Sequence, residues 1–151
     1  MIRGLLAVAL LTAAPLTGCA GTAEQPGAEP PRSGPQTTTL QISYDELMNQ
    51  KNITRTVALA VGDFLQLSLG SNASTGYQWD EQMQISDPKV LAQTGHQAVA
   101  PKQNVPGAPG SQVWMLQAMA PGTTSVSTSY GRPWAGGEKG TWTFTAEVTV
   151  K

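Results

Sequence analysis

The segment from Thr141 to Val150 constrains the fold of this chain more than any other. Apolar residues occupy every second position along it: Trp142, Phe144, Ala146, Val148 and Val150. Successive side chains of a β-strand point to opposite faces of a sheet, so this pattern predicts a strand with one buried and one solvated face. A chain with such a strand must provide other strands to pair with it and a core to cover it.

Short strands are predicted elsewhere within residues 40–151. Leu40 and Ile42 begin one, 57–61 and 64–69 alternate, Tyr77 and Trp79 open another, and 123–130 follows a Pro-Gly turn. Residues 112–120 are apolar on both faces, which predicts a central strand. Residues 45–50 predict a turn or short helix, and 88–99 contain one weak strand. Together these patterns predict an all-β fold of about 110 residues, either an immunoglobulin-like β-sandwich or a small barrel.

Composition excludes several functions. The 9 Lys and Arg residues and 10 Asp and Glu residues are scattered, so no basic stripe for nucleic acid is present. A single Cys and a single His cannot form a Cys/His zinc site, an intramolecular disulfide or a Cys-His catalytic pair. The hydroxyls of Ser74 and Thr75 have no base other than His96, which we expect in a solvated loop. The sequence therefore predicts neither an enzyme nor a cofactor.

The first residues have the pattern of an exported lipoprotein. Arg3 precedes an apolar run over 5–16 that is too short to span a bilayer, and Leu16-Thr17-Gly18-Cys19 resembles a bacterial lipobox. We expect a signal peptide over 1–18, lipidation of Cys19 and a flexible Pro-, Gly- and Thr-rich tether over 19–39, leaving a domain over 40–151. The chain would contact the membrane only through this lipid. We expect it in the cell envelope, anchored to the outer membrane and facing the periplasm. An ordinary secretory leader with a free Cys is the alternative.

Three loop segments between the predicted strands stand out. Asn72-Ala73-Ser74-Thr75-Gly76-Tyr77-Gln78-Trp79 begins with a small polar turn in which Gly76 suits a positive φ. Gly107-Ala108-Pro109-Gly110 precedes Val113-Trp114, and Tyr130-Gly131-Arg132-Pro133-Trp134 precedes a Gly pair. Each could merely join two strands. Their aromatic and Arg residues are also those that protein interfaces use as anchors.

The three segments together resemble the chagasin family of inhibitors of papain-like cysteine peptidases. The first is similar to its Asn-Pro-Thr-Thr-Gly-Tyr-x-Trp signature, the second to its Gly-rich loop, and the third to its Tyr-x-Arg-Pro-Trp segment. This sequence departs from the family pattern with Ala73 for Pro, Ser74 for Thr and Pro109 for Gly.

The resemblance implies that the three loops share one end of the sandwich and block the peptidase cleft without chemistry. Ser74-Thr75-Gly76 would enter the cleft while the other two loops grip its flanks, with Trp134 stacked on an aromatic residue of the enzyme. The implied contact residues are Asn72, Ser74, Thr75, Gly76, Gly107, Ala108, Pro109, Gly110, Arg132, Pro133 and Trp134. We expect a monomer with a papain-like cysteine peptidase as its partner. The alternative is an immunoglobulin-like envelope lipoprotein that binds a surface or assembly partner without inhibition.

The aromatic residues outside these loops are expected to be structural. Trp79, Trp114 and Trp142 lie within strand patterns, so we predict them in the core. Tyr77 is expected to pack beneath the first loop. Trp134 lies in a loop, where it serves either as an interface anchor or as part of a small local core.

Overall fold

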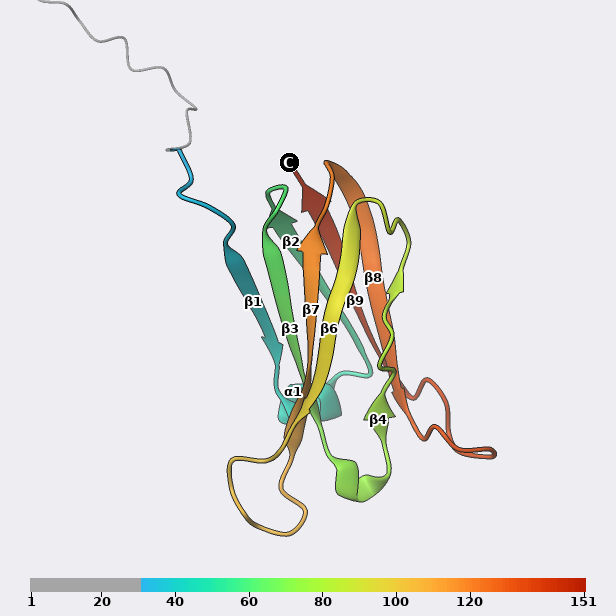
Figure 1. Ribbon diagram of the computed structural model, residues 1–151. Helices are drawn as coiled ribbons and strands as arrows, with labels where there is room; N and C mark the ends of the chain where they lie inside the picture. The colour runs from blue at the N-terminus through green and yellow to red at the C-terminus, as the bar shows by residue number, and fades with distance from the viewer. Residues whose placement is uncertain (1–30) are drawn as a thin grey trace, which may run out of the picture. The chain divides into compact units, whose positions relative to one another are not determined.

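The structure, a computed structural model, describes residues 31–151 and consists of two β-sheets packed face to face (Figure 1). One sheet has the order β1-β3-β7-β6, with β1 at Thr37–Ile42, β3 at Phe64–Ser71, β7 at Gly110–Ala118 and β6 at Leu91–Val99. The other has the order β2-β9-β8-β4, with β2 at Asn52–Leu59, β9 at Trp142–Val150, β8 at Gly122–Gly131 and β4 at Gln78–Trp79. The short strand β5, Gln84–Ile85, also pairs with β8. The predicted all-β class is confirmed, as a sandwich and not as a closed barrel.

The strand order sets the two ends of the sandwich. β1 pairs with β3 in parallel, from Thr37 opposite Phe64 to Ile42 opposite Leu69. β3 continues directly into the first loop, so β1 begins at the end of the sandwich opposite that loop (Figure 1). Residues 33–151 form one compact unit by themselves.

The N-terminal predictions are only partly within reach of the structure. The signal peptide over 1–18 and the lipidation site Cys19 lie outside the described residues. The tether predicted over 19–39 extends too far, because Thr37, Thr38 and Thr39 already belong to β1. The sequence pattern did not predict these three residues as part of a strand, because none of them is apolar. Their backbones nevertheless pair with β3.

The core lies between the sheets and is built from the alternating residues. Leu65, Leu67 and Leu69 of β3 are fully buried, as are Phe144, Ala146 and Val148 of β9. Burial of each Leu or Phe side chain stabilises the fold by about 1.5–3 kcal/mol. Trp79 and Trp114 lie in this core as predicted, whereas Trp142 is only partly buried and packs against its edge.

Several local predictions differ from the structure. Val61 was expected to continue a strand, but β2 ends at Leu59 and Val61 lies in the following turn, 49% exposed. The weak strand predicted within 88–99 is β6, which has nine residues and a bulge between Gln93 and Gly95. The bulge interrupts the alternation and explains why the sequence signal was weak. β7 lies between β3 and β6, as predicted for a central strand.

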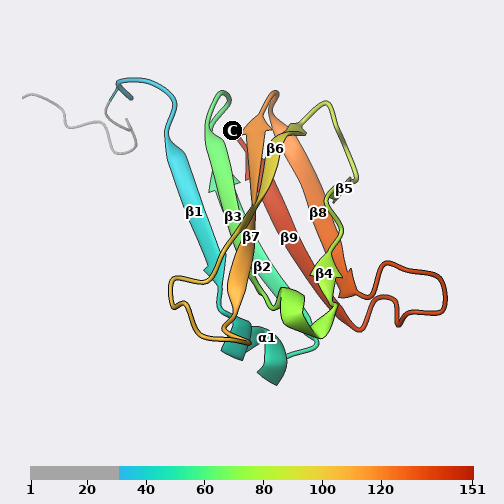
Figure 2. The same cartoon turned by 60° about the horizontal axis from the view of Figure 1, so that its bottom comes forward.

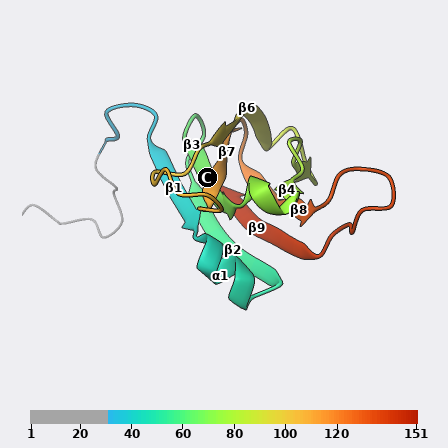
Figure 3. The same cartoon turned by 90° about the horizontal axis from the view of Figure 1, so that it is seen from below.

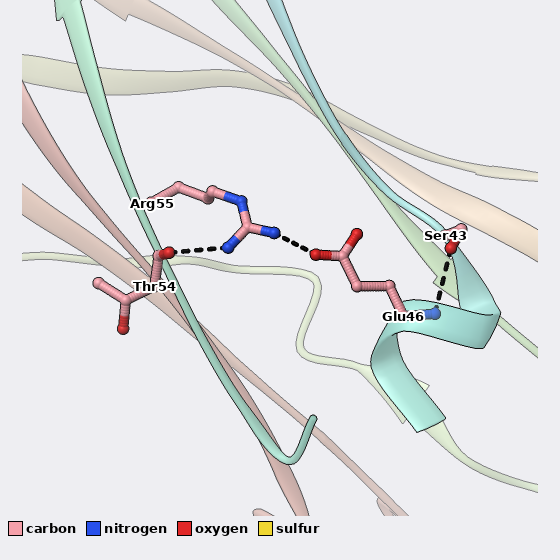
Figure 4. Close-up of polar contacts among 4 residues, drawn as sticks. All are labelled: Ser43, Glu46, Thr54 and Arg55. Carbon is pink, nitrogen blue, oxygen red and sulfur yellow. Dashed lines mark hydrogen bonds and ion pairs between the residues drawn. The ribbon is translucent and has the colours of Figure 1, made fainter. Parts of the chain in front are cut away.

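The segment predicted as a turn or short helix is the helix α1, Tyr44–Asn49. Ser43 caps it, since its Oγ accepts a hydrogen bond from the Glu46 amide at 3.1 Å. Arg55 of β2 forms an ion pair with Glu46 and donates to the Thr54 carbonyl (Figure 4). Leu47 is buried, so α1 closes the core at the end where β1 finishes (Figure 2). Within residues 31–151, no helix is long and apolar enough to cross a membrane.

Candidate functional site

The first loop is a short 3-10 turn, η1 at Ala73–Thr75, closed by its own side chains. The Asn72 side-chain oxygen accepts hydrogen bonds from the Ser74 amide at 3.2 Å and from the Ser74 hydroxyl at 2.6 Å. The Thr75 hydroxyl donates to the Asn72 carbonyl at 2.6 Å. Gly76 ends the turn in the left-handed region, with φ at 78°. Because these bonds are internal, the turn is held in one shape while Ala73, Ser74 and Thr75 stay exposed.

An aromatic cluster supports this turn from below. The buried Tyr130 hydroxyl accepts a hydrogen bond from the Asn72 amide at 2.9 Å. The Tyr130 ring lies 5.0 Å from Trp79, 5.6 Å from Tyr77 and 5.8 Å from Trp142, measured between centroids. Burial raises the pKa of Tyr130 above its ordinary value, so its hydroxyl stays protonated at neutral pH. The expected place of Tyr77 beneath the first loop agrees with these contacts.

The second loop joins β6 to β7 and is tied to the first. The Asn72 side-chain amide donates to the Gly107 carbonyl at 2.9 Å. Gly107 has a φ of 80°, within a turn in which the Ala108 amide donates to the Val105 carbonyl at 3.1 Å. Gly110 is not in the loop but is the first residue of β7, where a Cβ would lie 2.4 Å from the Val99 carbonyl oxygen. Gly110 therefore permits the close approach of β6.

The third loop joins β8 to β9 and carries the most exposed aromatic residue of the site. Trp134 is 50% exposed. Its ring lies against the first loop, since a Cβ placed on Gly76 would be 2.5 Å from Trp134 Cη2. The Arg132 guanidinium lies 4.6 Å from the Tyr77 ring centroid and 5.8 Å from that of Trp134. Pro133 is exposed between them.

The three loops therefore share one end of the sandwich, as the resemblance implied (Figures 1 and 3). A groove of about 740 Å³ runs between the first two loops. Its walls include Ser74, Val99, Val105 and Trp134. The site thus combines two rigid turns, a partly apolar groove and an aromatic ring at its margin.

The groups at this end are not arranged for catalysis. The Ser74 and Thr75 hydroxyls both donate to Asn72, and neither faces a base. His96 was expected in a solvated loop, but it lies in β6 opposite Trp114, with the two ring centroids 5.0 Å apart. Among residues 31–151, no group of His, Cys, Asp and Glu side chains could hold a metal ion.

Sequence reasoning missed two residues that contact this site. Glu138 accepts a hydrogen bond from the Tyr77 hydroxyl, and this bond is the main reason that the pKa of Tyr77 is raised. Lys139 bonds to the backbone of the third loop. Both lie just beyond the Arg-Pro-Trp segment. A charged pair after a Gly-Gly turn was the only signal that could have pointed to them.

Comparisons with known proteins agree with the geometry. Residues 58–148 match the model of the chagasin family, peptidase inhibitor I42. Chagasin of Trypanosoma cruzi is 29% identical over 83 residues, which cover 54% of this chain and 76% of chagasin.

Two solved structures have a similar fold. The cysteine protease inhibitor EhICP2 of Entamoeba histolytica has a TM-score of 0.59 at 20% identity, covering 77% of this chain and 97% of that one. PbICP-C, solved in complex with falcipain-2, has a TM-score of 0.53 at 23% identity, covering 77% and 99%. The chain therefore belongs to the chagasin family, whose members inhibit papain-like cysteine peptidases, and it is an inhibitor and not an enzyme.

Proposed function

We propose that this domain acts as a monomer and blocks the active-site cleft of a papain-like cysteine peptidase with its three loops. Ser74, Thr75 and Gly76 enter the cleft, with Asn72 holding the turn. Gly107, Ala108 and Pro109 of the second loop cover one flank, together with Gly110 at the start of β7. Arg132, Pro133 and Trp134 cover the other. The observation that carries the proposal is the pair of contacts that join the loops, from Asn72 to Gly107 and from Trp134 to Gly76.

The local structure accounts for reversible inhibition without cleavage. Peptidases bind the scissile bond within an extended segment, whereas residues 73–75 form a 3-10 turn whose hydroxyls are bonded internally. The loops are fixed before they meet the enzyme, so little conformational entropy is lost on docking. PbICP-C was solved in complex with falcipain-2, which supports a peptidase as the partner.

Inhibition assays with papain test this proposal. The soluble chain from Ala20 to Lys151 should slow hydrolysis of a small papain substrate, and mass spectrometry should recover it uncleaved. Trypsin, a serine peptidase with a different cleft, is the control and should be unaffected. Unchanged papain activity at micromolar inhibitor would reject the proposal for this class of enzyme. Binding to an envelope protein without inhibition would favour the interaction module instead.

We also propose that Cys19 carries a lipid that anchors the chain at the outer membrane, facing the periplasm. The support is the Leu16-Thr17-Gly18-Cys19 sequence after an apolar run. β1 begins at the end of the sandwich opposite the three loops, so a tether reaching it from the membrane leaves the loops free for a peptidase. Cys19→Ser should abolish lipidation and leave the domain folded. Mass spectrometry showing an unmodified Cys19 in the mature parent would contradict the anchor.

A further inference from the structure

A lysine just beyond the Arg-Pro-Trp segment holds the third loop by its backbone. Lys139 Nζ donates to the Arg132 carbonyl at 2.7 Å and to the Trp134 carbonyl at 2.9 Å. The Gly137 amide donates to the same Trp134 carbonyl at 3.1 Å. One ammonium group therefore fixes the backbone on both sides of Pro133. Hydrogen bonds to a charged donor are the stronger kind, although exposure to water weakens these.

The neighbouring glutamate holds the other side of the same loop. The Glu138 carbonyl accepts the Arg132 amide at 2.6 Å, and the Glu138 carboxylate accepts the Tyr77 hydroxyl. Tyr77 directly follows Gly76, so this bond links the third loop to the base of the first. The Arg132 guanidinium lies over the Tyr77 ring, 4.6 Å from its centroid. Glu138 and Lys139 thus hold the Arg132 backbone, the first at its amide and the second at its carbonyl.

The third loop needs such ties because its own backbone is permissive. Gly136 and Gly140 have φ values of 79° and 58°, which glycine adopts at little cost. Gly137 lies so close to Arg132 that a Cβ there would be 2.7 Å from Arg132 Cβ. A segment with three glycines would otherwise sample many conformations, and binding would have to select one of them.

We propose that Glu138 and Lys139 are positioning residues that set Arg132 and Trp134 in their binding conformation before the peptidase arrives. They act through the loop and not by contact with the enzyme. The inference rests on the proposed function and deepens it, since it names the source of the third loop's preorganisation. Because the contacts are exposed, losing Lys139 should weaken binding about three- to tenfold and not abolish it.

Lys139→Met is the test variant, since Met retains much of the chain length but cannot donate. Two measurements are made on the Ala20–Lys151 chain: the inhibition constant for papain, and hydrogen exchange of the Arg132 and Gly137 amides without enzyme. We expect weaker inhibition and faster exchange at both amides. Lys139→Arg, which retains the donor and the charge, should restore both. Lys89→Met removes the same charge from an exposed turn at the opposite end and should change neither.

A double-mutant cycle separates positioning from direct contact. If Lys139 acts through the loop, Lys139→Met should cost little further affinity once Trp134→Ala has removed the ring that it positions. Glu138→Gln retains the backbone bond to Arg132 but weakens the link to Tyr77, so a smaller loss of the same kind is expected.

Three results would overturn the inference. One is parent-like affinity and exchange for Lys139→Met. Another is weaker binding with unchanged exchange. The third is a loss that persists in full beside Trp134→Ala, which would mean that Lys139 contacts the enzyme directly. If the parent itself fails to inhibit papain, the proposed function fails for that enzyme. The exchange measurement on the free chain then decides whether the two residues order the loop.

Discussion

At the scale of single residues, Trp134 combines an exposed ring with support from a neighbouring loop. It is half exposed, and the Arg132 guanidinium lies 5.8 Å from its ring centroid. One edge of its ring lies on Gly76, which limits its freedom without burying it. Large aromatic residues with this combination of exposure and support often dominate the binding free energy of an interface.

Trp134→Ala should therefore weaken inhibition and spare stability. We expect a loss on the order of 2 kcal/mol or more of binding free energy, roughly thirtyfold in affinity, mainly as faster dissociation. Dissociation rate and melting temperature must be measured on the same variant. A melting temperature lower by several degrees would instead identify the ring as part of a local core. A stable variant that inhibits as well as the parent would refute the anchor role.

At the scale of secondary structure, the sequence predicts the strands in which apolar and polar residues alternate. It misses the features that depend on contacts made by the backbone. β3 and β9 were predicted closely because every second residue is apolar and buried. The sequence pattern of β6 was weak because a bulge shifts the alternation of its side chains. The start of β1 was missed because its Thr residues are not apolar. The loop residues were singled out through their motifs. Glu138 and Lys139 were not, since their contacts depend on how the third loop folds back.

Gly70 of β3 makes a close backbone contact that the alternating pattern of its strand does not predict. It lies beside the start of α1, where a Cβ would be 2.3 Å from the Tyr44 backbone nitrogen. Its carbonyl also accepts a hydrogen bond from Trp79 Nε1 at 3.0 Å. The position therefore admits only glycine without movement of β3 or α1.

Gly70→Ala should lower stability, because neither backbone segment can move without disturbing the core. Overpacking of this kind costs typically about 1–3 kcal/mol, which should lower the melting temperature by several degrees. Gly95→Ala is the matched control: it adds the same methyl group to another strand, where the nearest contact is Met115 Cβ at 3.9 Å. Equal melting temperatures for both variants would show that α1 can move aside for the added methyl group without loss of stability.

At the scale of the whole molecule, the sandwich turns three distant segments into one surface. The first loop follows β3 and the second joins β6 to β7, the neighbour of β3, while the third follows β8 of the facing sheet. Sequence spacing could not place them together, because the strand order that does so is set by long-range pairing. The Asn72 side chain joins the first two loops directly. It accepts a hydrogen bond from the Ser74 amide of the first loop and donates one to the Gly107 carbonyl of the second.

Asn72→Asp separates these two functions of Asn72. A carboxylate can still accept from the Ser74 amide and hydroxyl, so the first turn should persist. It cannot donate to the Gly107 carbonyl, and two acceptors would then face each other. The second loop should lose its tie to the first, and its ordering would have to occur on binding. We expect about tenfold weaker inhibition, equivalent to about 1.4 kcal/mol, with faster hydrogen exchange at Ala108.

The matched control for this change is Asn52→Asp in β2. Asn52 Oδ1 accepts a hydrogen bond from the Thr143 hydroxyl, and an aspartate at this position can accept it equally well. This variant adds the same charge to the domain and should inhibit as the parent does. If Asn72→Asp also inhibits as the parent does, the link between the first two loops contributes nothing to binding. Preorganisation would then reside within each loop separately and not in the way the sandwich joins them.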